Sequence, residues 1–166
     1  TGTTLNSQYY SGTAPNITID LSNQGITDLT GLDTITTPAP TDVAALNLSN
    51  NSLGSNGALP DNIFANWTTL KALNLSNNSL GQNEQVSEAL FANNTILLTL
   101  NLSNNSLGNI GALPANLFAN NVLLRTLDLS QNRLGGLPSI PSNLFQNNTR
   151  LNNLNLSLRS EEHTSE

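Results

Sequence analysis

Cysteine and methionine are absent from this 166-residue chain, and its one histidine, His163, lies within the last eight residues. Without cysteine there is no disulfide framework and no thiolate metal site, a composition that fits a secreted or surface protein about as well as a cytosolic one. Without a histidine in the body of the chain, Ser–His–Asp and Cys–His catalytic arrangements and the usual zinc sites are excluded.

Aromatic residues (4%) and charged residues (10%) are also scarce, and the hydrophobic fraction of 37% depends mainly on leucine. This composition suits a stack of repeats, in which each repeat packs its leucines against its neighbours. The net charge of −6 comes without a basic stripe, which argues against a nucleic-acid partner. No apolar run reaches 18 residues, so we expect no membrane insertion in this segment.

A 27-residue unit recurs six times and fills residues 16–158. From Leu70 it reads LKALNLSNNSLGQNEQVSEALFANNTI, and from Leu97 it reads LLTLNLSNNSLGNIGALPANLFANNVL. A fixed period of this length indicates a solenoid. The copies begin at Asn16, Val43, Leu70, Leu97, Leu124 and Leu151, and the last is truncated.

The first half of each unit predicts a short strand. Leu73 and Leu75 alternate with polar or small neighbours, which is the period of a half-buried strand. Stacked units then form a parallel sheet with steps of about 4.8 Å. The second half supplies the return connection that parallel strands need.

That second half, GALPDNIFANW in the second copy, predicts a helix of one or two turns, because proline suits a first helical turn and Leu59, Ile63 and Phe64 would share one face. A 3₁₀ turn is the alternative, since asparagine-rich segments form helices poorly.

Two columns of recurring residues are best explained by structure. Position 9 follows the strand, where an asparagine side chain can pair with the free backbone groups of a sharp turn. Position 22 places a phenylalanine in each connection, which predicts an aromatic spine in the core. The ladder asparagines are Asn51, Asn78, Asn105 and Asn132, and the spine residues are Phe64, Phe91, Phe118 and Phe145.

The motif LxxLxLxxNxL, written as LNLSNNSL at Leu46, Leu73 and Leu100 and as LDLSQNRL at Leu127, resembles that of the leucine-rich repeat family. The resemblance covers residues 16–158. The LP…LF element is similar to the typical subclass, and SEALFANNT to the ribonuclease-inhibitor-like one. The resemblance implies an α/β solenoid, a horseshoe with a parallel concave sheet and short convex helices or 3₁₀ turns, and a protein partner on the concave side.

The ends depart from the repeat. Residues 1–15 are interpreted as a partial repeat or an N-terminal cap, and residues 26–42 of the first copy lack the LP…LF element and predict a loop or an irregular turn. The final RSEEHTSE, residues 159–166, reads as an in-frame translation of a sequencing adapter; a natural polar tail is the alternative. On the first interpretation the natural chain stops near Leu158, the gene continues, the net charge is −4, and the last strand is an uncapped edge that frays or aggregates.

No arrangement of carboxylates predicts catalysis. Asp20 and Asp128 share position 5 but lie four repeats apart, about 19 Å, well beyond a glycosidase pair. Asp28 and Asp33 are explained by turn formation, with calcium binding as the alternative. We therefore expect no enzyme activity, no metal and no cofactor.

Several Asn-X-Ser/Thr sequons are by-products of the repeat. Asn66, Asn93 and Asn147, on the connections, are the better glycan acceptors in a eukaryotic secretory host.

The partner surface is predicted on the concave sheet, where positions 2, 3, 5, 7 and 8 should point outward. Positions 5, 7 and 8 barely vary, whereas positions 2 and 3 do. Lys71, Leu98 and Arg125 form a short mixed stripe, here called the contact stripe; ordinary solvated side chains are the alternative. The predicted partner-binding residues are Lys71, Leu98, Thr99, Arg125, Thr126, Asp128, Asn74 and Asn101.

Three functions remain open. The first is a non-catalytic interaction module that binds a protein, such as a host or cell-surface protein, through its concave face. The second is a structural spacer or adhesin stalk with a uniform, soluble surface. The third is the recognition arm of a larger enzyme. An extracellular or cell-surface location fits the first two, and the oligomeric state is open.

Overall fold

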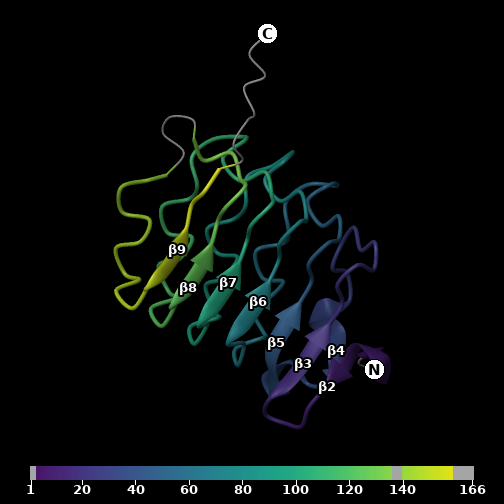
Figure 1. The fold of residues 1–166 in the computed structure, drawn as a ribbon. Coiled ribbons are helices and arrows are strands. Elements are labelled where there is room, and N and C mark those ends of the chain that lie inside the picture. The colour runs from purple at the N-terminus through teal and green to yellow at the C-terminus, as the bar shows by residue number, and fades with distance from the viewer. Residues whose placement is uncertain (1–2, 136–139, 159–166) are drawn as a thin grey trace.

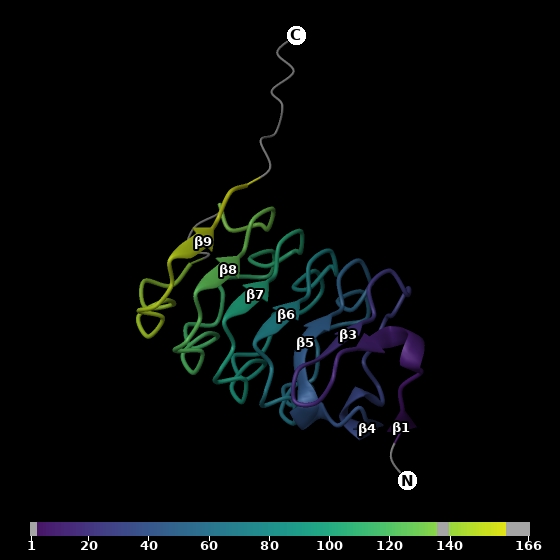
Figure 2. The same ribbon diagram turned by 60° about the horizontal axis from the view of Figure 1, so that its bottom comes forward.

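The computed structural model describes residues 3–135 and 140–158, which form a solenoid with strands along one side and turns along the other (Figures 1 and 2). The elements in chain order are β1 (Thr3–Thr4), η1 (Ser7–Tyr9), β2 (Tyr10–Ser11), β3 (Ile17–Asp20), η2 (Leu32–Thr34), β4 (Ile35–Thr37), η3 (Pro40–Asp42), β5 (Val43–Asn47), β6 (Ala72–Asn74), β7 (Thr99–Asn101), β8 (Thr126–Asp128) and β9 (Asn153–Asn155).

The main sheet has seven strands in the order β2-β3-β5-β6-β7-β8-β9. From β3 onward every pair is parallel, and each leucine pairs with the residue 27 positions later, as in Leu46 with Leu73 and Leu73 with Leu100. The sequence period therefore sets the register of the sheet, and the predicted parallel sheet is confirmed. In Figure 1 strand β3 and strands β5 to β9 lie side by side along the stack.

The turn side of repeats two to five contains no α-helix in the described residues, so the expectation of a one- or two-turn helix is wrong. Hydrogen bonds there join residues three apart, as in Ile63 N–H to Pro60 C=O (3.1 Å) and Trp67 N–H to Phe64 C=O (3.0 Å). These are isolated 3₁₀-type turns, close to the alternative. The physical reason is that so short a segment, rich in Asn, does not offset the cost of nucleating a helix.

The turns bury their apolar side chains all the same. Leu59, Ile63 and Phe64 are buried, as the pattern requires. The phenylalanine rings stack along the solenoid, with centroids 6.3, 6.3 and 6.1 Å apart from Phe64 through Phe91 and Phe118 to Phe145. The core is thus a set of columns, each made of one residue per repeat.

Residues 26–42 are more regular than the loop expected from the sequence. They contain η2, β4 and η3, and β4 pairs in parallel with β1 in a second, two-stranded sheet. Leu29, Leu32 and Ile35 are buried and take the place of the missing LP…LF element. Figure 2 shows this small sheet at the N-terminal end of the stack.

The strand β2 pairs antiparallel with β3, with Tyr10 opposite Ile19. It therefore does not continue the parallel series. It covers the free edge of β3, on the side away from β5.

Candidate functional site

The contact stripe lies at the starts of strands β6, β7 and β8. The carbonyl of Lys71 accepts hydrogen bonds from both Leu98 N–H (2.8 Å) and Thr99 N–H (3.0 Å), and the carbonyl of Leu98 likewise accepts from Arg125 (2.9 Å) and Thr126 (3.1 Å). One carbonyl thus accepts from two successive N–H groups where the next strand begins. The side chains of positions 2 and 3 both keep some exposure to solvent in these three repeats.

Lys71 and Arg125 are exposed and Leu98 is half-buried. Of the neighbouring threonines, Thr99 is exposed and Thr126 is half-buried. The structure therefore brings the residues of positions 2 and 3 together on three consecutive strands.

The two cations of the contact stripe have no carboxylate partner within the described residues. Lys71 Nζ makes one long contact, 3.4 Å, with Asn16 Oδ1. The Arg125 side chain makes no hydrogen bond or ion pair in the part of the chain that the structure describes.

The position-5 residues among the predicted contacts have a structural task. The side-chain oxygens of Asn74 and Asn101 accept from the N–H of the serine two residues later, at 3.0 and 2.9 Å. Asp128 accepts from both the N–H (2.9 Å) and the hydroxyl (2.6 Å) of Ser130. Each closes an Asx turn at the strand end, so only the rest of its polar group is free for a partner.

The same turn explains the acid at the other end of the column. Asp20 accepts from Ser22 N–H at 3.0 Å, and this bond, with one from the Ser22 side chain, lowers the pKa of the Asp20 carboxyl below its ordinary value. Asp20 on β3 and Asp128 on β8 are separated by β5, β6 and β7. They therefore form no carboxylate pair.

Position 7 was expected to point outward, and this is wrong for three of its six serines. Ser49, Ser76 and Ser130 are each 6% exposed. The chain turns inward here because the carbonyl of position 7 bonds to the position-9 asparagine, as in Asn78 Nδ2 to Ser76 O (3.1 Å).

Position 8 is uniform for a backbone reason. Asn50, Asn77 and Asn104 have φ angles of 56°, 55° and 55°, and Gln131 has 55°. This left-handed region is costly for most residues and is tolerated best by glycine and asparagine. The left-handed backbone of the turn therefore favours asparagine at position 8 without requiring it, since Gln131 adopts the same φ.

The position-9 asparagines are hydrogen-bonded on both ends of the amide. In Asn105, Nδ2 donates to the carbonyls of Leu75 and Leu102, both at 3.0 Å. Its Oδ1 accepts from Asn78 N–H and Leu80 N–H, also at 3.0 Å. The side chain thus joins two successive repeats.

Sequence reasoning missed a second buried asparagine column at position 25, made of Asn94, Asn121 and Asn148. Asn121 Nδ2 donates to Phe91 O (3.1 Å) and Asn94 O (3.0 Å), again across repeats. The recurring sequence ANN or QNN was the signal from which this column could have been predicted. Trp67 takes this position in the second repeat and is fully buried.

The aspartates proposed as an alternative calcium site serve turns. Asp28 Oδ1 accepts from Thr30 N–H at 2.8 Å, and hydrogen bonds from the Thr30 side chain and backbone lower the pKa of Asp28. No group of three or more His, Cys, Asp or Glu residues able to hold a metal occurs in residues 3–135 and 140–158.

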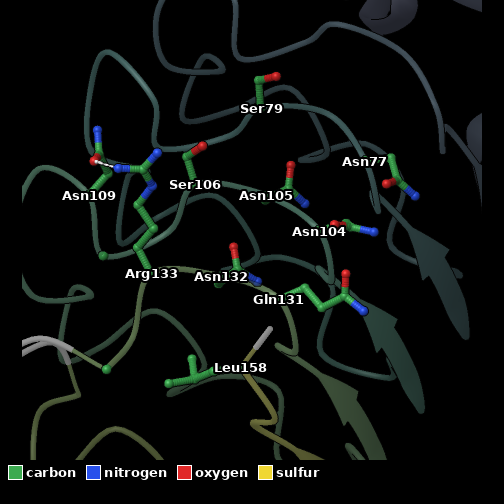
Figure 3. Close-up of a pocket in the computed structure, with 12 residues that line it drawn as sticks. Asn77, Ser79, Asn104, Asn105, Ser106, Asn109, Gln131, Asn132, Arg133 and Leu158 are labelled. Carbon is green, nitrogen blue, oxygen red and sulfur yellow. Dashed lines mark hydrogen bonds between the residues drawn. The ribbon is translucent and has the colours of Figure 1, made fainter. Parts of the chain in front are cut away.

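An open hollow of about 1160 Å³ lies beyond the ends of strands β6–β9 (Figure 3). Its lining is mainly Asn, Ser and Gly from the turns, and among the described residues that line it Arg133 is the one titratable group. Arg133 Nη1 donates to Asn109 Oδ1 at 3.0 Å, and Asn105 and Asn132 at its floor are engaged in the position-9 ladder. The described residues that line the hollow therefore include no acid–base pair.

The sequons on the turn side lie in an exposed row. Asn93 and Asn147 each donate a side-chain hydrogen bond to the previous repeat, at 3.3 and 3.0 Å, and Asn66 is exposed as well. Their use as glycan acceptors stays a prediction.

Within the described residues, the chain contains no helix that is both long and apolar enough to span a bilayer.

Comparison with known proteins agrees with this geometry. The Leucine Rich Repeat family model matches residues 69–93 and 123–144, and no curated protein sequence matches the chain. Among solved structures, the chain is similar to internalin C2 of Listeria monocytogenes, with a TM-score of 0.58 and 22% identity over 84% of this chain and 51% of that one. A chain of the Toll–Spatzle complex of Drosophila matches with a TM-score of 0.35 and 22% identity, over 84% of this chain and 26% of that one.

The protein spans about half the length of the internalin chain, and at this level of identity the likeness concerns the fold alone. The two segments that the family model matches contain strands β6 and β8 of the sheet. The segments at residues 69–93 and 123–144 are leucine-rich repeats by the family model, and the chain has the fold of a leucine-rich repeat solenoid.

Proposed function

We propose that the protein is a non-catalytic interaction module that binds a protein partner through the outward face of its seven-stranded sheet. The contacts are the contact stripe, Lys71, Leu98 and Arg125, with the neighbouring Thr99, Thr126, Asp128, Asn74 and Asn101. The leucine-rich repeat fold is one that protein-interaction modules typically have.

One observation carries the proposal. On strands β6–β8 the residues of positions 5, 7 and 8 are fixed by their own turns, whereas the side chains of Lys71 and Arg125 are exposed and have no carboxylate partner in the described chain. These two side chains differ between repeats, carry charge and take part in no turn. They are therefore available to recognise a partner. Arginine is also enriched among the residues that dominate binding energies.

A structural spacer or stalk is the second candidate function. The specific observation in its favour is the uniformity of positions 5, 7 and 8, which present nearly the same polar surface in every repeat. A uniform, soluble surface needs no partner.

The double variant Leu98→Ala/Arg125→Ala separates the two candidates. Its matched control is Ile110→Ala/Arg133→Ala, which removes one exposed apolar residue and one exposed arginine elsewhere on the molecule. Both variants and the wild type are screened for affinity against a displayed panel of extracellular protein domains. We expect at least one domain whose affinity falls about ten-fold or more in the first variant and is unchanged in the control.

Binders that treat the two variants alike would refute the proposed contact surface. A panel without any binder, together with a rigid rod-like envelope in small-angle scattering, would favour the spacer.

A further inference from the structure

The contact stripe has a regular spacing in which two cations flank an apolar side chain. Lys71, Leu98 and Arg125 hold the same position in consecutive repeats, and each N–H bonds to the carbonyl of the one before, at 2.8 and 2.9 Å. Neighbouring strands are about 4.8 Å apart. Lys71 and Arg125 therefore start about 10 Å apart, with Leu98 midway between them.

This row is positive in a protein that is otherwise acidic. The net charge is −6, and most of the carboxylates lie off the sheet, on the turns and in the first connection. The acid nearest in sequence to Arg125 is Asp128, whose carboxylate is engaged by Ser130. The cations thus lack a carboxylate within the described residues, and a partner that supplies carboxylates meets no competing internal ion pair.

The spacing selects the form of such a partner. Along an α-helix, residues i and i+7 lie on one face about 10.5 Å apart, and residues i+3 and i+4 lie between them on the same face. This helical spacing agrees to within roughly 1 Å with the distance of about 10 Å between the two cations of the contact stripe. Lysine and arginine side chains are flexible enough to adjust to the difference. An extended strand matches less well, because its same-side residues fall about 6.7 and 13 Å apart.

The neighbouring side chains leave room for a helix. On the adjacent position, β6 has Ala72, β7 has Thr99 and β8 has Thr126. These are small residues, and none of them carries a charge that would repel an acidic helix.

We propose that Lys71, Leu98 and Arg125 form a docking row for an amphipathic helix of the partner, laid across strands β6–β8, with acidic residues at i and i+7 and apolar residues at i+3 and i+4. This inference rests on the proposed function and specifies the chemistry of the partner. The acidic residues pair with Lys71 and Arg125, and the apolar residues cover Leu98.

The test uses the full chain and synthetic helical peptides of about 18 residues, long enough to hold helical structure. The first peptide has Glu at i and i+7 and Leu at i+3 and i+4. The second has the same composition but carries its second Glu at i+5, off the binding face. The third has Lys at i and i+7. Affinities are measured by fluorescence anisotropy.

The protein variants are Lys71→Glu/Arg125→Glu, the neutral pair Lys71→Gln/Arg125→Gln, and the matched control Arg133→Glu, which reverses an exposed cation off the row. We expect the first peptide to bind wild type and Arg133→Glu equally. Its affinity should be about ten-fold lower for the neutral pair, since each exposed ion pair contributes about three-fold, and lower again for the reversed double variant, whose new carboxylates repel those of the peptide. The Lys peptide should show the opposite preference. The neutral pair should give an intermediate affinity even if the reversed variant folds poorly.

Equal affinity for the i+7 and i+5 peptides, an equal loss in Arg133→Glu, or no peptide binding would each overturn the docking row. Self-association of the chain that Lys71→Glu/Arg125→Glu abolishes would assign the row to a second copy and overturn it too. If the peptides fail but a protein domain still loses affinity in Leu98→Ala/Arg125→Ala, the proposed function stands and only this inference fails.

Discussion

At the scale of single residues, asparagine has three different roles at three nearby positions of each repeat. Position 5 closes an Asx turn, position 8 tolerates a left-handed backbone, and position 9 joins two repeats through buried hydrogen bonds, as in Asn101, Asn104 and Asn105. Three neighbouring asparagines therefore respond differently to substitution.

The first prediction compares Asn105→Ala with Asn101→Ala. Asn105→Ala leaves buried backbone groups of two repeats without partners, which costs about 1–3 kcal/mol each in the free energy of unfolding. Asn101→Ala removes one half-exposed turn bond and should cost about 1 kcal/mol or less. Chemical denaturation of both variants measures the difference, and a larger loss for Asn101→Ala would contradict the assignment.

The second prediction concerns the backbone of Asn104, whose φ is 55°. Asn104→Gly should leave the free energy of unfolding nearly unchanged, because glycine accepts this conformation readily. Asn104→Val should lower it by about 1–2 kcal/mol, because a β-branched residue is strained there. Equal stability of the two variants would show that the turn does not impose this conformation.

The third prediction concerns Asp20, whose carboxyl pKa the Ser22 N–H holds below the ordinary 3.8. A carboxyl with a lower pKa in the folded state stabilises the protein above the unfolded pKa, and this contribution disappears as the pH falls through the folded pKa. Because Asp20 is exposed, the effect on stability is small, and an NMR titration of its carboxyl carbon is the better measurement. A titration midpoint at or above 3.8 would be the contrary result.

At the scale of elements, the strands could be predicted from the sequence and the connections only in part. Leu73 and Leu75 alternate with polar or small residues, and that local pattern is enough to define the strand and its buried face. In the turns, Leu59, Ile63 and Phe64 have a spacing that a helix and a set of 3₁₀-type turns can both satisfy. The choice depends on the packing of the neighbouring repeats, which the sequence of one repeat does not contain.

The first connection shows the same limit. Residues 26–42 lack the recurring leucine and phenylalanine positions, and their strand β4 forms because β1 lies beside it. Pairing between segments about 30 residues apart leaves no periodic signal. The inward turn at Ser76 was missed for a related reason, because it follows from the Asn78 bond to the Ser76 carbonyl.

The fourth prediction concerns β9, which is less covered than the strands before it. Leu154 is 38% exposed, whereas its counterparts Leu100 and Leu127 are fully buried. Strand opening should therefore cost less at β9, and hydrogen exchange should be fastest at the Asn153 and Asn155 amides and slowest in β6 and β7. Equal protection of β9 and β7 would mean that another chain or segment covers this strand in solution.

At the scale of the whole molecule, the fold accounts for most of the repeated residues. Leucines and phenylalanines fill the core, and asparagines at positions 5, 8, 9 and 25 stabilise the turns. The side chains of Lys71 and Arg125 contribute to neither the core nor the turns. The repeat period predicted the solenoid and placed the contact stripe on one row. The repeat pattern does not indicate the chemistry of the partner, so the partner is inferred from the charge and the spacing of the contact stripe.

In the proposed function, the partner lies against the sheet at the contact stripe. The most direct test places a photoreactive residue at the exposed Thr99, or at the exposed Gln146 on the turn side as the control, and irradiates each protein with a domain found to bind the chain. We predict a covalent adduct from Thr99 and none from Gln146. An adduct from Gln146 alone would contradict the proposed contact surface.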